Sequence, residues 1–315
     1  MRRLIFCVAM LFFISCKPRL IEVEKSGMVF GSYVRIKVIG ESKEGLDKAV
    51  DKALQEMGRL DSLWSLFSDK SEVVRLNRNK KGFVSEETRD LLKRAHDFGE
   101  RTGGVFDITV EPLLRVWGFY DGNYQVPESA VIAGLLERVD YRGVVVKGES
   151  VVLGNNVNID LGGIAVGYAV DRVVELLQAS EVKQGLIDAG GDIRVFGNRD
   201  WRVGVQHPRK QGVVKVLQLR ERAVSTSGDY EQFFEREGKR FCHIIDPRTG
   251  YPAQSCAAVT VIAPNALEAD VYATTLFVLG VDEGREMLKS LPGVEAYFFE
   301  ARGDSVIIIR AGGDE

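Results

Sequence analysis

The sequence has few of the residues that cross-link chains or bind transition metals, with four cysteines and three histidines among 315 residues. Two of the cysteines, Cys7 and Cys16, belong to the N-terminal segment, which leaves Cys242 and Cys256. Two thiols could form one disulfide in an oxidising compartment, but they are not a disulfide framework, and nothing has the spacing of a zinc site. We therefore expect Cys242 to be a core residue beside His243 rather than a nucleophile.

An excess of positive charge is also missing. The chain carries 42 Lys and Arg against 45 Asp and Glu, a formal net charge of −3. Because this balance lacks the basic footprint of nucleic-acid-binding proteins, no nucleic-acid partner is expected. With 45% apolar residues, the chain can bury a substantial core in one large or two ordinary domains.

Long apolar runs are absent except at the N-terminus. Met1 to Arg3 is a short basic region, and Leu4 to Ile14 is almost wholly apolar but too short to span a bilayer comfortably. This pattern predicts a signal peptide over residues 1–15. Ser15-Cys16 is similar to a bacterial lipoprotein cleavage site, although Phe13 stands where Leu is usual.

Cleavage before Cys16 would make this residue a lipidated N-terminus. The protein would then be anchored to the outer face of the cytoplasmic membrane, on the periplasmic side of a bacterial cell envelope. Ordinary secretion with cleavage nearby is the alternative. Residues 16–27 are interpreted as a tether and residues 28–315 as the folded domain.

Apolar periodicity predicts a mixture of strands and helices. Val34, Ile36 and Val38 alternate with polar residues as in a half-buried strand, and residues 46–60 have the spacing of an amphipathic helix. Because the two kinds of element do not alternate regularly, an α+β fold of mixed sheets with packed helices is favoured over a doubly wound sheet. Further elements are expected as helices at 86–101, 127–139, 266–279 and 283–290, a hairpin at 144–146 and 151–153, a strand that passes through a glycine pair into a helix over 158–178, and strands at 186–188, 193–196, 202–206, 213–219 and 241–245, before two closing strands.

Three polar segments lie close together in the C-terminal third of the chain: STSGDYEQFF, CHIIDPRTGYP and LEADVYATT. So many polar groups are costly to bury unless a ligand supplies some of their partners. In the last segment Asn265 and Glu268 form a capping-box pair, and Asp270 and Thr274 lie on one face of the helix. This oxygen-only pair suits a hard cation such as Mg2+, although by itself it could be a surface Asp and a Thr bonded to its own helix.

Two other turns could face a ligand. Asp160-Leu-Gly-Gly163 opens a helix, and glycines there let backbone groups approach a phosphate, although a tight turn needs glycine in any case. Residues 102–109 form a polar turn that precedes Trp117 and other aromatic residues. That turn could bind a planar ring or could be a capped turn above a core tryptophan.

Short segments then follow one another in an order that is typical of one family. They are Phe30-Gly-Ser, Ser71-Glu-Val-Val-Arg-Leu-Asn77, Gly104-Val-Phe-Asp107, Trp117-Gly-Phe, Asp160-Leu-Gly-Gly-Ile-Ala, Gly190-Gly-Asp-Ile-Arg, Ser225-Thr-Ser-Gly-Asp-Tyr, His243-Ile-Ile-Asp-Pro-Arg-Thr-Gly and Glu268-Ala-Asp-Val-Tyr-Ala-Thr. Together they resemble the ApbE family, FAD:protein FMN transferases that are often exported lipoproteins. The likeness runs from about Met28 to Phe299 and implies an ApbE-like (T-fold-like) α+β architecture.

The resemblance implies a reaction and a metal site. Such enzymes use Mg2+ and FAD, attach FMN through a phosphoester to a Thr or Ser of an acceptor protein, and release AMP. The acceptors are typically flavoprotein subunits of membrane redox complexes. Asp270 and Thr274 match the family's metal-binding side chains, and Gly163 matches the position whose carbonyl binds the same ion. His243 matches the candidate general base, and an ordinary pKa near ~6.5 would let it accept a proton at neutral pH.

The resemblance also implies which residues contact FAD. Val105, Phe106 and Asp107 match a segment that contacts the flavin nucleotide in relatives, and Asp160 and Ile245 match further contact positions.

Other positions differ from the family's pattern. Phe67 stands where Tyr is frequent and Phe30 where Met is frequent; both could pack on a flat ring or simply in the core. Val166 stands near the nucleotide where the family commonly has Lys, so we expect altered affinity or nucleotide geometry rather than lost activity. Ala273 stands where some members have a second acidic residue near the metal, which leaves the number of metal ions open.

Two other functions remain compatible with the sequence. Water could replace the acceptor hydroxyl, which would make the protein a Mg2+-dependent FAD pyrophosphatase that yields FMN and AMP. Alternatively, the protein could be a non-catalytic FAD-binding lipoprotein, for which Val166 is the most favourable feature. The combination of Asp270, Thr274 and His243 argues against the carrier, because a binding protein needs no base beside a metal.

Overall fold

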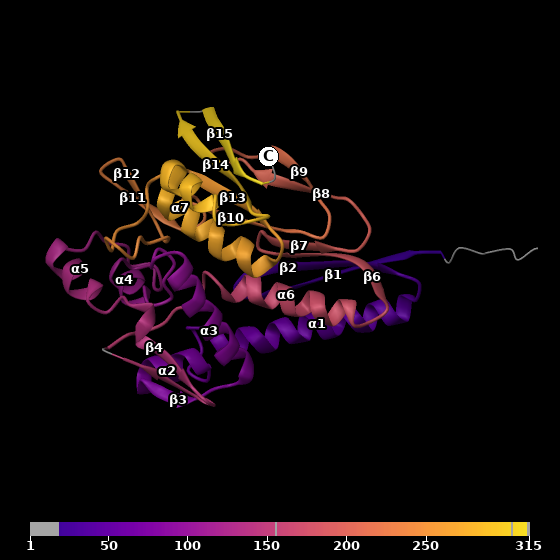
Figure 1. Ribbon diagram of the computed structural model, residues 1–315, viewed down its shortest axis with the longest axis horizontal. Coiled ribbons are helices and arrows are strands. Elements are labelled where there is room, and N and C mark those ends of the chain that lie inside the picture. Colours follow the sequence, from indigo (N-terminus) through magenta and orange to yellow (C-terminus); the bar gives the residue numbers. More distant parts are fainter. Residues whose placement is uncertain (1–18, 155, 304, 314–315) are drawn as a thin grey trace, which may run out of the picture.

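The computed structural model describes residues 19–154, 156–303 and 305–313 (Figure 1). The predicted signal peptide and the lipidated Cys16 lie outside this part of the chain. Within the described part, no helix has both the length and the apolar character needed to cross a membrane. The tether expected over residues 16–27 is shorter in the structure, because Ile21–Val29 forms strand β1, which buries Val23 and Val29.

An eight-stranded antiparallel sheet forms the centre of the molecule (Figure 1). The strand predicted around Val34 to Val38 is confirmed, and its three alternating apolar side chains are fully buried. In order across the sheet, the strands are β1 (Ile21–Val29), β2 (Ser32–Gly40), β6 (Val182–Ala189), β7 (Asp192–Phe196), β10 (Ala223–Gly228), β13 (Ala258–Ala263), β14 (Glu295–Arg302) and β15 (Ser305–Gly312).

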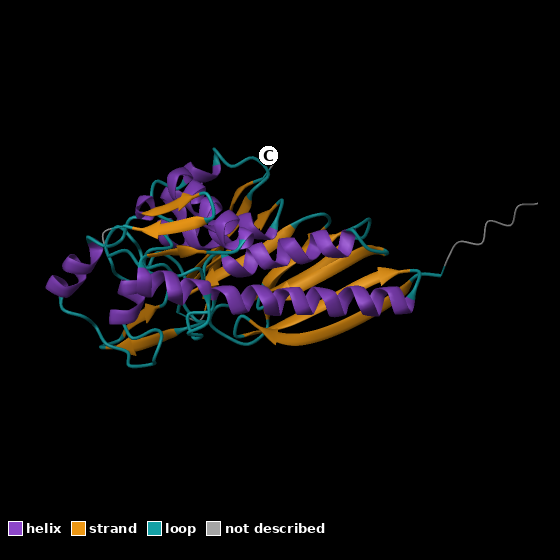
Figure 2. Cartoon of the chain, turned by 90° about the horizontal axis from the view of Figure 1, so that it is seen from below, coloured by secondary structure: helices purple, strands orange, loops and turns teal. Residues whose placement is uncertain are grey.

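Three long helices cover one face of this sheet: α1 (Lys43–Trp64), α6 (Ala165–Gln178) and α7 (Ala266–Leu288) (Figure 2). The other face packs against a two-stranded ribbon of β8 (Trp201–Gln206) and β9 (Val213–Leu219). Alternating apolar side chains on the central strands supply both cores, because successive residues of a strand face opposite sides.

Shorter elements pack beside one end of the sheet. The helix predicted at 86–101 is confirmed as α3, and the predicted hairpin is confirmed as β4 and β5. These elements are α2 (Glu72–Asn79), β3 (Lys81–Phe83), α3 (Glu86–Arg101), α4 (Glu111–Val116), α5 (Ser129–Leu136), a 3-10 turn at Tyr141–Gly143, β4 (Val144–Lys147), β5 (Ser150–Leu153) and the hairpin of β11 (Phe233–Arg236) and β12 (Lys239–Cys242).

Two local predictions need correction. The stretch 158–161 is not a strand: Ile159 pairs with the side-chain amide of Asn77, and the Asp160 N–H donates to the Ile108 carbonyl at 2.7 Å. The strand expected at 241–245 ends at Cys242 as β12. The two helices expected at 266–279 and 283–290 are confirmed as the two parts of α7, which non-helical backbone at Gly280 separates.

Both cysteines outside the N-terminal segment carry free thiols. Cys242 is buried, and burial raises the pKa of its thiol to about 12. A thiol that resists ionisation is a poor nucleophile, which agrees with the predicted core role.

Candidate active site

A cleft of about 690 Å³ opens where the sheet meets the shorter elements. The turn between β1 and β2, the turn between β6 and β7, strand β10, the segment before α6 and the first turns of α7 all contribute side chains. The structure brings every predicted catalytic, FAD-contacting and metal-binding residue to the wall of this one cleft. These residues are Phe30, Phe67, Val105, Phe106, Asp107, Asp160, Gly163, Val166, His243, Ile245, Asp270 and Thr274.

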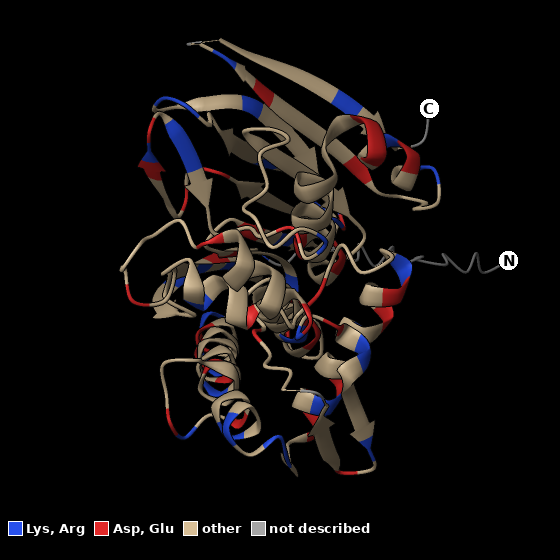
Figure 3. Cartoon of the chain, turned by 90° about the vertical axis from the view of Figure 1, so that its left-hand side faces the viewer, with Lys and Arg blue, Asp and Glu red and all other residues tan. Residues whose placement is uncertain are grey.

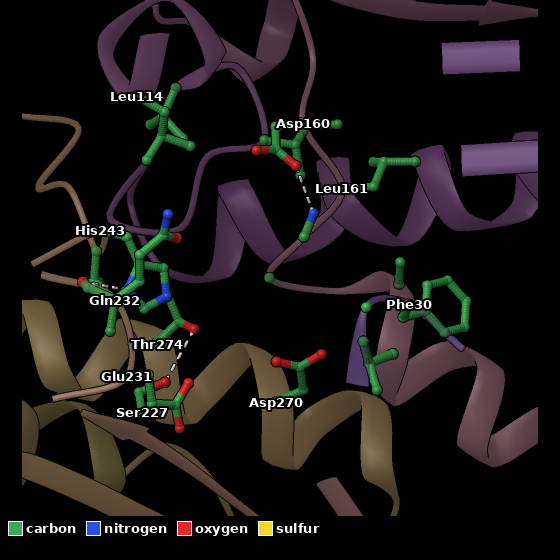
Figure 4. Close-up of a pocket in the computed structure, with 18 of the residues that line it drawn as sticks. Phe30, Leu114, Asp160, Leu161, Ser227, Glu231, Gln232, His243, Asp270 and Thr274 are labelled. Carbon is green, nitrogen blue, oxygen red and sulfur yellow. Dashed lines mark hydrogen bonds between the residues drawn. The ribbon is translucent and has the colours of Figure 1, made fainter. Parts of the chain in front are cut away.

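The predicted metal ligands converge in the cleft. Figure 4 shows Asp270 and Thr274 projecting from α7 toward the loop that carries Asp160. The Thr274 hydroxyl lies 3.2 Å from that of Ser227, and a Cβ placed on Gly163 would lie 3.8 Å from the Thr274 oxygen. Carboxylate, hydroxyl and carbonyl oxygens are the donor types that a hard divalent cation takes, so these residues fit Mg2+ by their chemistry.

The charges of the cleft point to the same conclusion. Among the described residues that line it, six are acidic and none is Lys or Arg; the acidic ones are Asp61, Asp107, Asp160, Asp192, Glu231 and Asp270. Figure 3 shows Lys and Arg interspersed with Asp and Glu along the outer helices, so the imbalance is local. An anionic ligand would be repelled from such a wall unless cations accompany it.

Three of the acids influence one another. Burial and the nearby Asp192 raise the pKa of Asp270. Burial also raises the pKa of Asp192 to about 6. For Glu231, burial and the nearby charge of Asp192 raise the pKa to about 7. Asp192 and Glu231 were not predicted as site residues, although both lie in the polar segments Gly190-Gly-Asp and Ser225-Thr-Ser-Gly-Asp-Tyr-Glu.

His243 follows directly after β12 with its ring in the cleft wall. Its Nδ1 lies 3.3 Å from the backbone carbonyl of Gln232. A carbonyl can only accept, so Nδ1 carries the proton in this contact and Nε2 keeps a lone pair. Burial lowers the pKa of His243, which keeps the ring neutral at pH 7. The side chain is therefore arranged to accept a proton at Nε2.

Two of the residues predicted to contact FAD, Asp107 and Asp160, are carboxylates whose hydrogen bonds hold loops of the cleft wall in place. The Asp107 carboxylate accepts hydrogen bonds from Thr109 N, Thr109 Oγ1 and Tyr141 N, so this side chain holds its own loop together. Asp160 accepts a hydrogen bond from the Tyr120 hydroxyl at 2.6 Å and from Gly162 N at 2.7 Å. Tyr120, which the sequence analysis did not single out, therefore fixes the glycine turn before α6.

Aromatic side chains line the end of the cleft near β1. Phe30, at the tip of the β1–β2 turn, stacks on Trp64 with ring centroids 6.4 Å apart. Phe67 is 82% exposed at the cleft wall, so its side chain is open to solvent. These rings offer flat apolar surface to a planar ligand.

Two of the departures from the family's pattern, Val166 and Ala273, lie in different surroundings. Val166 lies in the first turn of α6, half-buried and in the cleft wall, where it offers no charge. Ala273 is fully buried in the core and does not line the cleft. Of these two substitutions, only Val166 bears on the charge of the cleft.

Comparison with known proteins identifies the family. The ApbE family model matches residues 30–298. FAD:protein FMN transferase of Treponema pallidum is 31% identical over 309 residues, covering 90% of this chain and 85% of the relative, and that of Escherichia coli K12 is 30% identical over 328 residues, covering 96% and 93%.

Solved structures show the same likeness. The crystal structure of the ApbE protein from Thermotoga maritima has a TM-score of 0.82 at 33% identity and covers 92% of this chain and 97% of its own. The apo flavinyl transferase ApbE of Pseudomonas stutzeri has a TM-score of 0.84 at 29% identity, with 93% and 95% covered. The chain belongs to the ApbE family, with the predicted α+β architecture, and by that membership it is a transferase.

Proposed function

We propose that the protein transfers FMN from FAD to a Thr or Ser hydroxyl of an acceptor protein, with Mg2+, forming a phosphoester and releasing AMP. The names of the relatives support flavin transfer in general. The observation that carries the finer proposal is the cleft itself, where an oxygen-only ligand set faces a neutral histidine with a free Nε2.

The proposed step conserves atoms and charge. The acceptor hydroxyl oxygen attacks the phosphorus of the FMN half of FAD, the bond from that phosphorus to the bridging oxygen breaks, and AMP leaves with this oxygen. His243 Nε2 takes the proton of the attacking hydroxyl. Mg2+, held by Asp270, Thr274 and the Gly163 carbonyl, would neutralise the phosphate charges that the acidic wall otherwise repels.

The remaining wall residues position FAD. The stacked pair of Phe30 and Trp64 offers a face for a planar ring, and the glycine turn fixed by Asp160 and Tyr120 brings backbone groups close to the diphosphate. Val105, Phe106 and Ile245 supply apolar surface between these points.

We also propose that the enzyme works at the outer face of the cytoplasmic membrane, held by a lipid on Cys16. The N-terminal apolar run and the Ser15-Cys16 pair support this location. Acceptors would then be flavoprotein subunits of membrane redox complexes whose acceptor hydroxyl faces the same compartment.

A product assay on the mature chain tests the proposal. With FAD, Mg2+ and a protein bearing an acceptor Thr, we expect AMP release matched by covalent, fluorescent flavin on the acceptor. Replacing His243 by Ala should lower the transfer rate by about 100-fold or more if this ring is the base. AMP and free FMN without labelling would instead establish FAD hydrolysis, and intact bound FAD would establish a carrier.

Hydrolysis is the second candidate function, because the aromatic Phe67 is 82% exposed and the cleft wall at this point is open to water. The same base could act on water in place of the acceptor hydroxyl. A rise of AMP over labelled acceptor as the acceptor is diluted would measure how far the two reactions compete.

A further inference from the structure

Helices α6 and α7 are linked by reciprocal hydrogen bonds, in which a carboxylate of each helix accepts from backbone N–H groups in the first turn of the other. Asp171 of α6 accepts hydrogen bonds from Ala266 N at 2.8 Å and Leu267 N at 3.0 Å, the first two residues of α7. In return, Asp270 of α7 accepts one from Gly167 N at 3.1 Å, in the first turn of α6. Each helix thus supplies an acceptor for backbone N–H groups of the other that lack an intrahelical partner.

Neither helix end is complete without this exchange. The residue before α6, Ile164, makes no side-chain cap hydrogen bond, so Asp270 supplies the missing acceptor. At α7, Asn265 accepts from Glu268 N at 2.9 Å, which leaves Ala266 N and Leu267 N to Asp171. The bonds to Asp171 therefore complete the first turn of α7, and the bond to Asp270 satisfies Gly167 N in the first turn of α6.

Gly167 sets how closely the helices approach. A Cβ at this position would lie 2.7 Å from the Ala266 carbonyl oxygen and 2.9 Å from Asp270 Cβ, closer than real side chains come. The backbones can meet here only because the residue is glycine. Asp171 is also paired with Arg194 of β7, which ties the exchange to the sheet.

This contact determines the separation of the metal-ligand segments. Gly163 precedes α6 by two residues, and Asp270 and Thr274 belong to α7. Any sliding or tilting of α7 against α6 would therefore change the distance between the Gly163 carbonyl and the Thr274 hydroxyl. Asp171 does not line the cleft, so it can influence the site only through the helices.

We propose that Asp171 is a positioning residue for the metal site and that its bonds to Ala266 N and Leu267 N hold α7 in the register that binds Mg2+. The inference rests on the proposed function, because it takes Asp270, Thr274 and Gly163 as the ligands. Partners that orient metal ligands typically change metal affinity by about 10-fold to 100-fold when they are removed.

Calorimetric titration of the metal-free mature protein with MgCl2 tests this role. Asp171→Asn keeps the size of the side chain but replaces one acceptor oxygen by an NH2 group, and we expect Mg2+ affinity to fall by about 10-fold or more. Flavin transfer should recover most of its maximal rate at saturating Mg2+, since no group that touches the substrate is changed. Glu175→Gln is the matched control: it removes another α6 carboxylate, paired with Arg172 and away from α7, and should leave the affinity unchanged.

Gly167→Ala perturbs the same contact between α6 and α7 at a second point. It tests the role of this contact in Mg2+ binding if Asp171→Asn does not fold. Weaker Mg2+ binding in a folded variant supports the inference. A lower unfolding temperature with unchanged Mg2+ affinity would show a merely structural cap and overturn it. If the unmodified protein bound no Mg2+, both the inference and the metal part of the proposed function would fail. If Asp171→Asn weakened Mg2+ binding but no variant transferred flavin, only the proposed function would fail.

Discussion

The folded protein places the Asp270 carboxylate where its ionised form is disfavoured. Its carboxylate is 7% exposed and close to Asp192, and both burial and this neighbour raise its pKa. One hydrogen bond, from Gly167 N, offsets only part of that cost. A carboxylate placed in this way is typical of a site that a cation completes.

Replacing Asp270 by Asn should therefore separate stability from activity. The amide oxygen can still accept from Gly167 N, while the repulsion from Asp192 is removed. At pH 8 and without metal, we expect a gain of about 1 kcal/mol in the free energy of unfolding, or roughly 2 °C in Tm. Mg2+-dependent flavin transfer should be abolished. A lower Tm together with normal transfer would show that Asp270 is a structural residue.

With Val166 at this position, none of the described residues that line the cleft is Lys or Arg. We expect Val166→Lys to tighten FAD binding in the absence of Mg2+ by about fivefold, roughly 1 kcal/mol, because its ammonium can offset the acidic wall. Val166→Met, of similar length but uncharged, is the control. Quenching of flavin fluorescence measures both affinities, and equal binding by the two variants would argue against a missing charge at this position.

Helix α7 contains a break that the sequence analysis placed between two separate helices. Gly280 has φ 73° and ψ −168°, a conformation essentially restricted to glycine. The Ser255 hydroxyl donates to the Phe277 carbonyl just before the break. Ser255 thus satisfies a carbonyl next to the kink, and the last residues of α7 pack on the sheet through the buried Leu288.

A pair of glycine substitutions tests this interpretation of α7. Gly280→Ala should lower the free energy of unfolding by about 2 kcal/mol or more, since its Cβ would also lie 2.7 Å from Ser255 Cβ. Gly58→Ala, in the middle of α1 with nothing within 4 Å, should raise stability by about 0.5–1 kcal/mol. Urea unfolding of both variants gives the comparison. Equal effects would mean that the backbone at Gly280 is not strained for alanine.

The fold as a whole carries the acidic residues of its cleft at an energetic cost that depends on pH. The pKa of Glu231 is raised from its ordinary value to about 7, so its contribution to stability is complete at low pH and is lost as the pH rises through about 7. Asp192, with a pKa of about 6, acts in the same direction. A bound cation would favour the ionised forms of these acids and reduce this loss.

We therefore expect the Tm of the metal-free protein to fall, relative to that of Glu231→Gln, between about pH 5 and about pH 8. Addition of Mg2+ should narrow the difference between the two proteins at the alkaline end. Differential scanning calorimetry across this range, with EDTA or with Mg2+, measures both effects. A Tm difference that does not change with pH would show that the pKa of Glu231 is not raised in the folded protein.

Local pattern was sufficient for the parts of this protein whose structure depends on neighbouring residues. The spacing of apolar residues predicts the helix at 46–60, and Ser85 and Gly103-Gly104 mark the ends of the helix at 86–101. The order of short segments predicts the family and the residues that meet in the cleft. Asp270 and Thr274 could be paired from sequence because four residues of helix place both side chains on one face.

Long-range pairing determined the rest. The burial of strand β1 depends on α1 and β2, so its sequence by itself resembles a tether, and helix α2 is too short to show a clear periodicity of its own. The meeting of Asp192, Glu231 and Asp270 joins residues far apart in the chain, and so do the bonds from Ala266 N to Asp171 and from Gly167 N to Asp270. Burial and the approach of like charges raise the pKa values, and both exist only once the sheet and its helices have packed.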